Sequence, residues 1–130
     1  MVNINPAYRL TELEYALNKV SCRALVLWDE FKTSNYLEMI GTLAPETSHC
    51  EPGQLKAKRL PYLDTLIQIT EQARPGFYKF DDICSLANNS DIENMLEAQS
   101  SFQPDDPINI QFTKRNHHRL NQRQLSNPKL

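Results

Sequence analysis

Three pairs of neighbouring carboxylates are the first residues in this sequence whose chemistry could matter. They are Asp29-Glu30, Asp81-Asp82 and Asp105-Asp106. Such pairs could act as a general acid and base, or could bind Mg²⁺. The alternative is that they are solvated or sit at turns and helix starts, where the helix dipole favours negative charge. Nothing around them completes a catalytic set, so the second interpretation is preferred and no catalytic residue is assigned.

Histidine and cysteine are the other residue types that could form a reactive site. His117 and His118 could be proposed as a metal pair, but adjacent side chains point in different directions on regular elements, and the surrounding segment has no Cys, Asp or Glu. Cys22, Cys50 and Cys84 are widely spaced, which is typical of reduced thiols rather than of a zinc site. Cys22 adjoins an apolar run and is interpreted as a packing residue. No metal site is predicted.

Charge is distributed unevenly along the 130 residues, although the net charge is only −2. All 16 acidic residues lie at or before Asp106, whereas the segment after Thr113 is basic and poor in large apolar side chains. This segment, residues 114–130, could contact phosphates of nucleic acid or an anionic membrane. It has no aromatic side chain on which a base could stack, so a disordered tail is the preferred interpretation and nucleic acid is not an expected partner.

Alternation and spacing of apolar residues predict a mixed α/β chain. Strands are expected at Val2–Asn5, Arg23–Trp28, Thr65–Thr70 and Ile108–Phe112. Helices are expected at Thr11–Val20, from Thr33 or Ser34 to Leu43, near Asp81–Ala87 and near Asp91–Gln99. Capping boxes are expected at Thr11-Glu14 for the first of these helices and at Ser90-Glu93 for the last. Because the strands alternate with helices and the run at Arg23–Trp28 is apolar on both faces, the pattern favours a parallel-sheet layer with flanking helices. No run of apolar residues is long enough to span a membrane.

Several separated blocks of the sequence resemble the AMP-forming acyl-CoA synthetases, and within them the mitochondrial medium-chain type. The blocks are Val2–Tyr8, Leu13–Leu17, Cys22–Val26, Phe31–Thr33, Pro52–Lys56, Arg59–Pro61 and Asp106–Thr113. The resemblance implies that residues 1–113 are an interior slice of the N-terminal adenylation (AMP-binding) domain, and that the basic tail at 114–130 is unrelated to the family. The chain is therefore expected to be a truncated fragment.

The resemblance assigns one position of this chain to a nucleotide site. Thr113 matches the first residue of the family's glycine-rich phosphate loop, whose backbone N–H groups must close around the phosphates of ATP. The match stops at Lys114, and no glycine follows Gly76. The family uses ATP, Mg²⁺ and coenzyme A, but none of these is expected to bind this chain.

The resemblance also implies a function. The family activates a fatty acid, here of medium chain length, with ATP to an acyl-adenylate and then forms the thioester with coenzyme A. This chain is expected to be inactive alone because it lacks most of the phosphate loop and the C-terminal domain. The alternative is a non-catalytic interaction module that pairs with an intact synthetase through open strand edges at Val2–Asn5 and Ile108–Phe112. The family implies a mitochondrial location, while the absence of an import peptide leaves a cytoplasmic one open.

Overall fold

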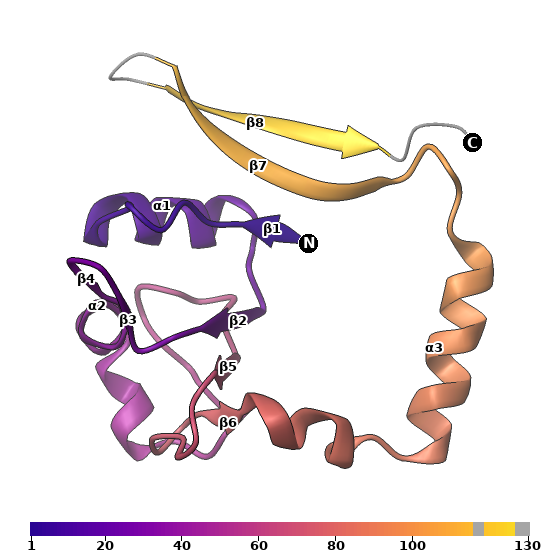
Figure 1. Ribbon diagram of the computed structural model, residues 1–130, viewed down its shortest axis with the longest axis horizontal. Coiled ribbons are helices and arrows are strands. Elements are labelled where there is room, and N and C mark those ends of the chain that lie inside the picture. Colours follow the sequence, from indigo (N-terminus) through magenta and orange to yellow (C-terminus); the bar gives the residue numbers. More distant parts are fainter. Residues whose placement is uncertain (116–118, 127–130) are drawn as a thin grey trace. The chain divides into compact units, whose positions relative to one another are not determined.

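The computed structural model describes residues 1–115 and 119–126, with the backbone alone described at 113–115 and 119–126. The chain divides into two compact units, which are described separately (Figure 1). The sheet unit is Pro6–Leu86. The hairpin unit combines Met1–Asn5 with the described residues from Ala87 onward.

The sheet unit is built on a three-stranded parallel sheet in the order β2-β5-β6. The strands are β2 (Ala24–Leu27), β5 (Thr65–Gln68) and β6 (Tyr78–Lys79). The unit also contains a short antiparallel hairpin of β3 (Glu30–Phe31) and β4 (Ser34–Asn35) and four helices. The helices are α1 (Leu10–Lys19), α2 (Tyr36–Leu43), and the 3₁₀ helices η1 (Pro45–His49) and η2 (Phe80–Leu86). The predicted α/β class with parallel strands is confirmed, and α2 lies on the connection between β2 and β5.

Helix α1 begins one residue before the expected start and uses a different cap. The backbone N–H of Arg9 donates to the Glu12 carboxylate at 3.1 Å, so the reciprocal bond of a capping box involves Glu12 rather than the expected Thr11 and Glu14. Leu13 and Leu17 then face the core at helical spacing. The helix does not cross between neighbouring strands of one sheet, because β1 and β2 belong to different sheets.

Helix α2 begins at Tyr36, later than the sequence predicts, because Ser34 and Asn35 pair with Glu30 and Phe31 in the β3–β4 hairpin. The side chain of Asn35 accepts a hydrogen bond of 2.9 Å from the backbone N–H of Glu38, which satisfies one of the free donors of the first turn. The hairpin turn puts Lys32 in the left-handed region at φ 54°. The turn residues Lys32 and Thr33 include no glycine or asparagine, so the sequence does not predict this hairpin.

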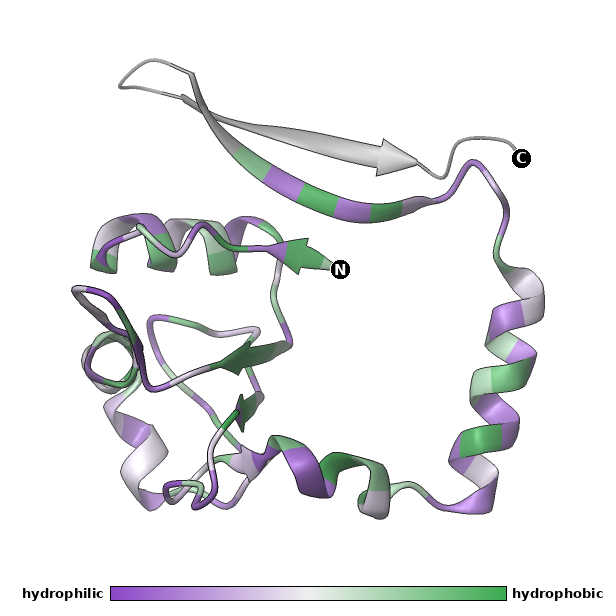
Figure 2. Ribbon diagram, in the orientation of Figure 1, coloured by the Kyte–Doolittle hydropathy of each residue, from purple (hydrophilic) through white to green (hydrophobic). Residues whose placement is uncertain are grey.

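The two faces of the β2-β5-β6 sheet differ in exposure. On one face, Leu27, Leu66 and Gln68 are buried. On the other face, Val26, Trp28 and Ile69 are exposed. Strand β2 (ALVL) is apolar throughout and β5 (TLIQ) is apolar at its two central residues, so apolar side chains stand on both faces (Figure 2). The expectation of a strand apolar on both faces is confirmed, but only one face is covered.

The hairpin unit contains β1 (Val2–Asn3), α3 (Asn89–Ser101), β7 (Pro107–Arg115) and β8 (Arg119–Ser126). Strand β1 pairs with β7 in parallel, with Val2 opposite Ile110, and β8 pairs with β7 in the antiparallel direction. Because β7 has a partner on each side, the open edge expected at Ile108–Phe112 is not present. Helix α3 is capped by Asn88 and Asp91, whose side chains each accept the other's backbone N–H at 3.0 and 2.9 Å, two residues before the expected box at Ser90.

The C-terminal segment differs from its expectation. The sequence predicts a tail without regular structure at residues 114–130, whereas the backbone of Arg119–Ser126 forms β8. The edge of β7 that faces away from β1 has backbone N–H and C=O groups that need hydrogen-bond partners. The backbone of a neighbouring segment can supply them whatever its side-chain hydropathy. Residues 116–118 and 127–130 of the tail lie outside the described residues. In the described part of the chain, no helix is both long enough and apolar enough to cross a membrane.

Candidate functional site

The carboxyl ends of β2 and β5 are the first place to look for a site, because ligands of parallel sheets bind outside this edge. Asp29 follows β2, and Gln68 is the last residue of β5. The Gln68 Nε2 donates to Asp29 Oδ1 at 2.6 Å, and the backbone N–H of Arg74 donates to Gln68 Oε1 at 2.9 Å. The backbone carbonyl of Asp29 accepts from the N–H of Tyr36 at 2.9 Å. These contacts join the loops that follow both strands.

The polar groups at this edge are engaged with one another rather than presented to a ligand. Gln68 is only 1% exposed, and its donor and its acceptor each have a partner. The arrangement therefore fixes the loops that follow the two strands. Sequence reasoning did not single out Gln68; the available signal was a glutamine at a core-facing position of an otherwise apolar strand, where a buried amide must find partners.

The other acidic pairs lie in turns and helix starts, which agrees with their preferred interpretation. Asp81 lies in the first turn of η2, and its Oδ2 is 3.8 Å from the Lys79 Nζ. Asp106 accepts the backbone N–H of Gln103 at 2.7 Å and so closes a turn before β7.

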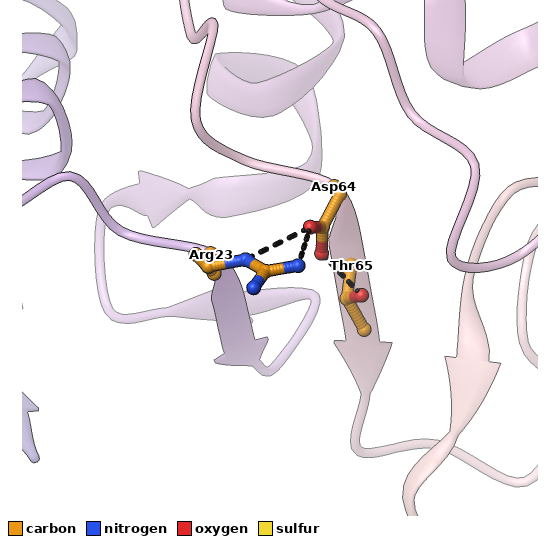
Figure 3. A network of polar contacts seen from close by, with 3 residues as sticks. All are labelled: Arg23, Asp64 and Thr65. Atoms are coloured by element: carbon orange, nitrogen blue, oxygen red, sulfur yellow. Dashed lines mark hydrogen bonds and ion pairs between the residues drawn. The ribbon is translucent and has the colours of Figure 1, made fainter.

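A polar network lies at the opposite, amino-terminal edge of the same sheet (Figure 3). The Arg23 guanidinium donates to Asp64 Oδ2 through Nε at 3.1 Å and Nη2 at 2.7 Å, while the Thr65 hydroxyl donates to Asp64 Oδ1 at 2.7 Å. The hydrogen bond from Thr65, together with that from Arg23, lowers the pKa of Asp64 below its ordinary value. The Arg23 carbonyl also accepts the N–H groups of Asp64 and Thr65. The network sets the register of β2 against β5 at the edge that ligands do not use.

A second ion pair holds α1 to the extended segment before β5. The Arg59 guanidinium donates to both Glu14 carboxylate oxygens, at 2.8 and 2.6 Å, and the Asn18 side chain donates to the Arg59 carbonyl at 2.9 Å. The hydrogen bonds from Arg59 lower the pKa of Glu14. Two parallel hydrogen bonds from a guanidinium to a carboxylate are the strongest geometry for an ion pair. Because Glu14 lies on α1, this ion pair positions α1 against the segment that contains Arg59.

Metal and thiol chemistry finds no support in the described residues. Within them, no group of three or more His, Cys, Asp and Glu side chains could hold a metal ion. The Cys22 thiol precedes β2, donates to the Ala24 carbonyl at 3.2 Å, and has its pKa raised by burial, which disfavours the thiolate. His117 and His118 lie outside the described residues.

The glycines show whether the chain could cradle a nucleotide. Gly53 and Gly76 have positive φ values of 79° and 81°, but their open sides face protein atoms. A Cβ on Gly53 would lie 2.9 Å from the Tyr78 hydroxyl, and one on Gly76 would collide with the Thr47 carbonyl. Gly41 lies in α2. The glycines therefore serve turns and close packing, and these residues do not fit ATP phosphates or their Mg²⁺ ion.

Thr113, the position assigned to the start of a phosphate loop, has its backbone in β7, opposite Asn121 of β8. Its assignment to a nucleotide site stays a prediction.

Comparison with known proteins relates the chain to acyl-CoA ligases. It is 40% identical over 113 residues to the mitochondrial medium-chain acyl-CoA ligase ACSF2 of Danio rerio, and 40% identical over 114 residues to that of Homo sapiens. It is 34% identical over 113 residues to a putative acyl-CoA synthetase, YngI, of Bacillus subtilis. Each match covers 87% of this chain but only 18%, 18% and 21% of the respective relative.

No protein-family model matches the chain, and no solved structure matches it. The chain spans about a fifth of the length of the curated relatives, so the comparison concerns one segment of those proteins. The resemblance carried by the separated sequence blocks is confirmed: along 87% of its length, this chain is related in sequence to a segment of the acyl-CoA synthetases.

Proposed function

We propose that this chain is a scaffold segment of a medium-chain acyl-CoA synthetase and does not by itself activate a fatty acid. The relatives named as medium-chain acyl-CoA ligases support the substrate class: a medium-chain fatty acid, ATP and coenzyme A. In the complete reaction, the acid attacks the α-phosphorus of ATP to give an acyl-adenylate, which then transfers its acyl group to the coenzyme A thiol. None of these steps is assigned to a residue of this chain.

The observation that carries the proposal is how the glycines and buried polar groups are used. Phosphoryl chemistry needs backbone N–H groups and cations free to meet developing charge. Here Gly53 and Gly76 are packed against Tyr78 and Thr47, and the buried Gln68 is engaged with the Asp29 carboxylate and a backbone N–H. These groups hold the loops and the strands in place, which is a structural role rather than a catalytic one.

The direct test is ATP–pyrophosphate exchange by the purified 130-residue chain with octanoate and Mg²⁺. A full-length medium-chain acyl-CoA ligase assayed in parallel establishes that the conditions support activation, and circular dichroism establishes that the chain is folded. We expect exchange by the ligase and none by the chain above a blank without protein. Exchange by the chain that scales with its concentration would refute the proposed inactivity.

We also propose a mitochondrial location, supported by the mitochondrial ligases among the relatives. Fractionation of cells expressing the chain with a C-terminal tag would test it. Recovery of the tagged chain with matrix markers, protected from protease in intact organelles, is the expected result. Recovery in the cytosolic fraction would contradict the proposal.

A second candidate function is pairing with an intact synthetase, and one specific observation favours it. Strand β2 lies at the end of its sheet in the described part of the chain, so its outer row of N–H and C=O groups has no neighbouring strand there. Val26 of this strand and Trp28, which directly follows it, are 46% and 55% exposed. An edge strand with large apolar side chains favours association with a partner that supplies a further strand or covering layer.

Binding of a full-length medium-chain acyl-CoA ligase to the immobilised chain would test this candidate. We expect Trp28→Ser to weaken binding at least about tenfold, because exposed aromatic side chains dominate interface energies. Tyr62→Ser is the matched control, since Tyr62 is 54% exposed and lies outside the sheet. Equal binding by both variants, or no binding by the unaltered chain, would reject pairing through β2 without affecting the proposed scaffold role.

A further inference from the structure

We draw no further inference here: the strongest candidate, the exposed apolar face of the β2-β5-β6 sheet at Val26, Trp28 and Ile69, lies on the sheet already invoked for partner binding, and nothing in the structure shows what covers it.

Discussion

Gln68 is the side chain whose replacement gives the sharpest test of how the sheet unit is held together. It is 1% exposed, donates to the Asp29 carboxylate at 2.6 Å and accepts the Arg74 N–H at 2.9 Å. Gln68→Met preserves the length and unbranched shape of the side chain but removes both hydrogen bonds. The substitution therefore leaves a carboxylate oxygen and a backbone N–H without this partner at the carboxyl edge.

The expected cost follows from these two contacts. A buried group that loses its partner costs about 1–3 kcal/mol, and Asp29 is only half-buried, so water can replace part of its lost bond. The buried methionine regains about 1–2 kcal/mol by removing apolar surface from water. The net loss of unfolding free energy is then about 1–3 kcal/mol. For a domain of about 60–100 residues this corresponds to a Tm roughly 5–20 °C lower.

Urea unfolding followed by tryptophan fluorescence is a suitable assay, because Trp28 is the sole tryptophan and adjoins Asp29. Gln54→Leu is the matched control, since Gln54 is exposed, and we expect it to change the unfolding free energy by less than about 0.5 kcal/mol. Asp29→Ala should cost less in the Gln68→Met background than in the unaltered chain, with a coupling of about 1–2 kcal/mol.

Two results would refute this reasoning. If Gln68→Met were as stable as the unaltered chain, the buried amide would contribute nothing beyond its packing. If the costs of Gln68→Met and Asp29→Ala were simply additive, the 2.6 Å contact would carry no energy and the loops would be held by other groups.

Four further predictions test other contacts. Gly76→Ala should destabilise the sheet unit by at least about 1–2 kcal/mol in urea unfolding, because φ is +81° and the new Cβ meets the Thr47 carbonyl. Gly41→Ala, at an open helical position, should instead stabilise it by about 0.5–1 kcal/mol; the same sign for both would contradict the packing. Leu66→Ala should cost about 2–5 kcal/mol, as Leu66 is 0% exposed, and an unchanged urea midpoint would exclude it from the core. The lowered pKa of Glu14 gives stability that is present above its ordinary value of 4.5 and lost as pH falls through the lower folded value; Glu14→Gln should therefore flatten the acid side of a Tm–pH profile, and an unchanged profile would argue against the pair.

Local patterns were enough to predict the main helices and strands of the sheet unit. The spacing of Leu13 and Leu17 predicts α1, and the apolar runs predict β2 and β5 to within two residues of their observed ends. Such signals are local, because helix and strand periods are written in neighbouring residues. The capping boxes predicted from the sequence are wrong, because several Asn, Asp, Ser and Thr residues near each helix start are chemically competent and the tertiary position of the chain selects among them.

The short elements could not be predicted from the sequence. Strands β3, β4 and β6 have two residues each, too few for a period, and they exist because a partner lies alongside. The same holds for β8. Its polar and basic residues predict a tail without regular structure, but its backbone pairs with β7. The contacts that set loop geometry, such as Asp29 with Gln68 and Arg23 with Asp64, join residues about 40 positions apart.

The sequence by itself determined the family resemblance, the α/β class and the absence of a glycine-rich loop after Gly76, since these depend on residue identity and short-range order. Only the tertiary structure decided that Gly53 and Gly76 pack against protein atoms, that the polar residues at the sheet edges bind one another, and that one sheet face stays exposed. The physical reason is that hydrogen bonding and burial depend on tertiary contacts between segments far apart in the sequence, and local sequence patterns do not specify those contacts.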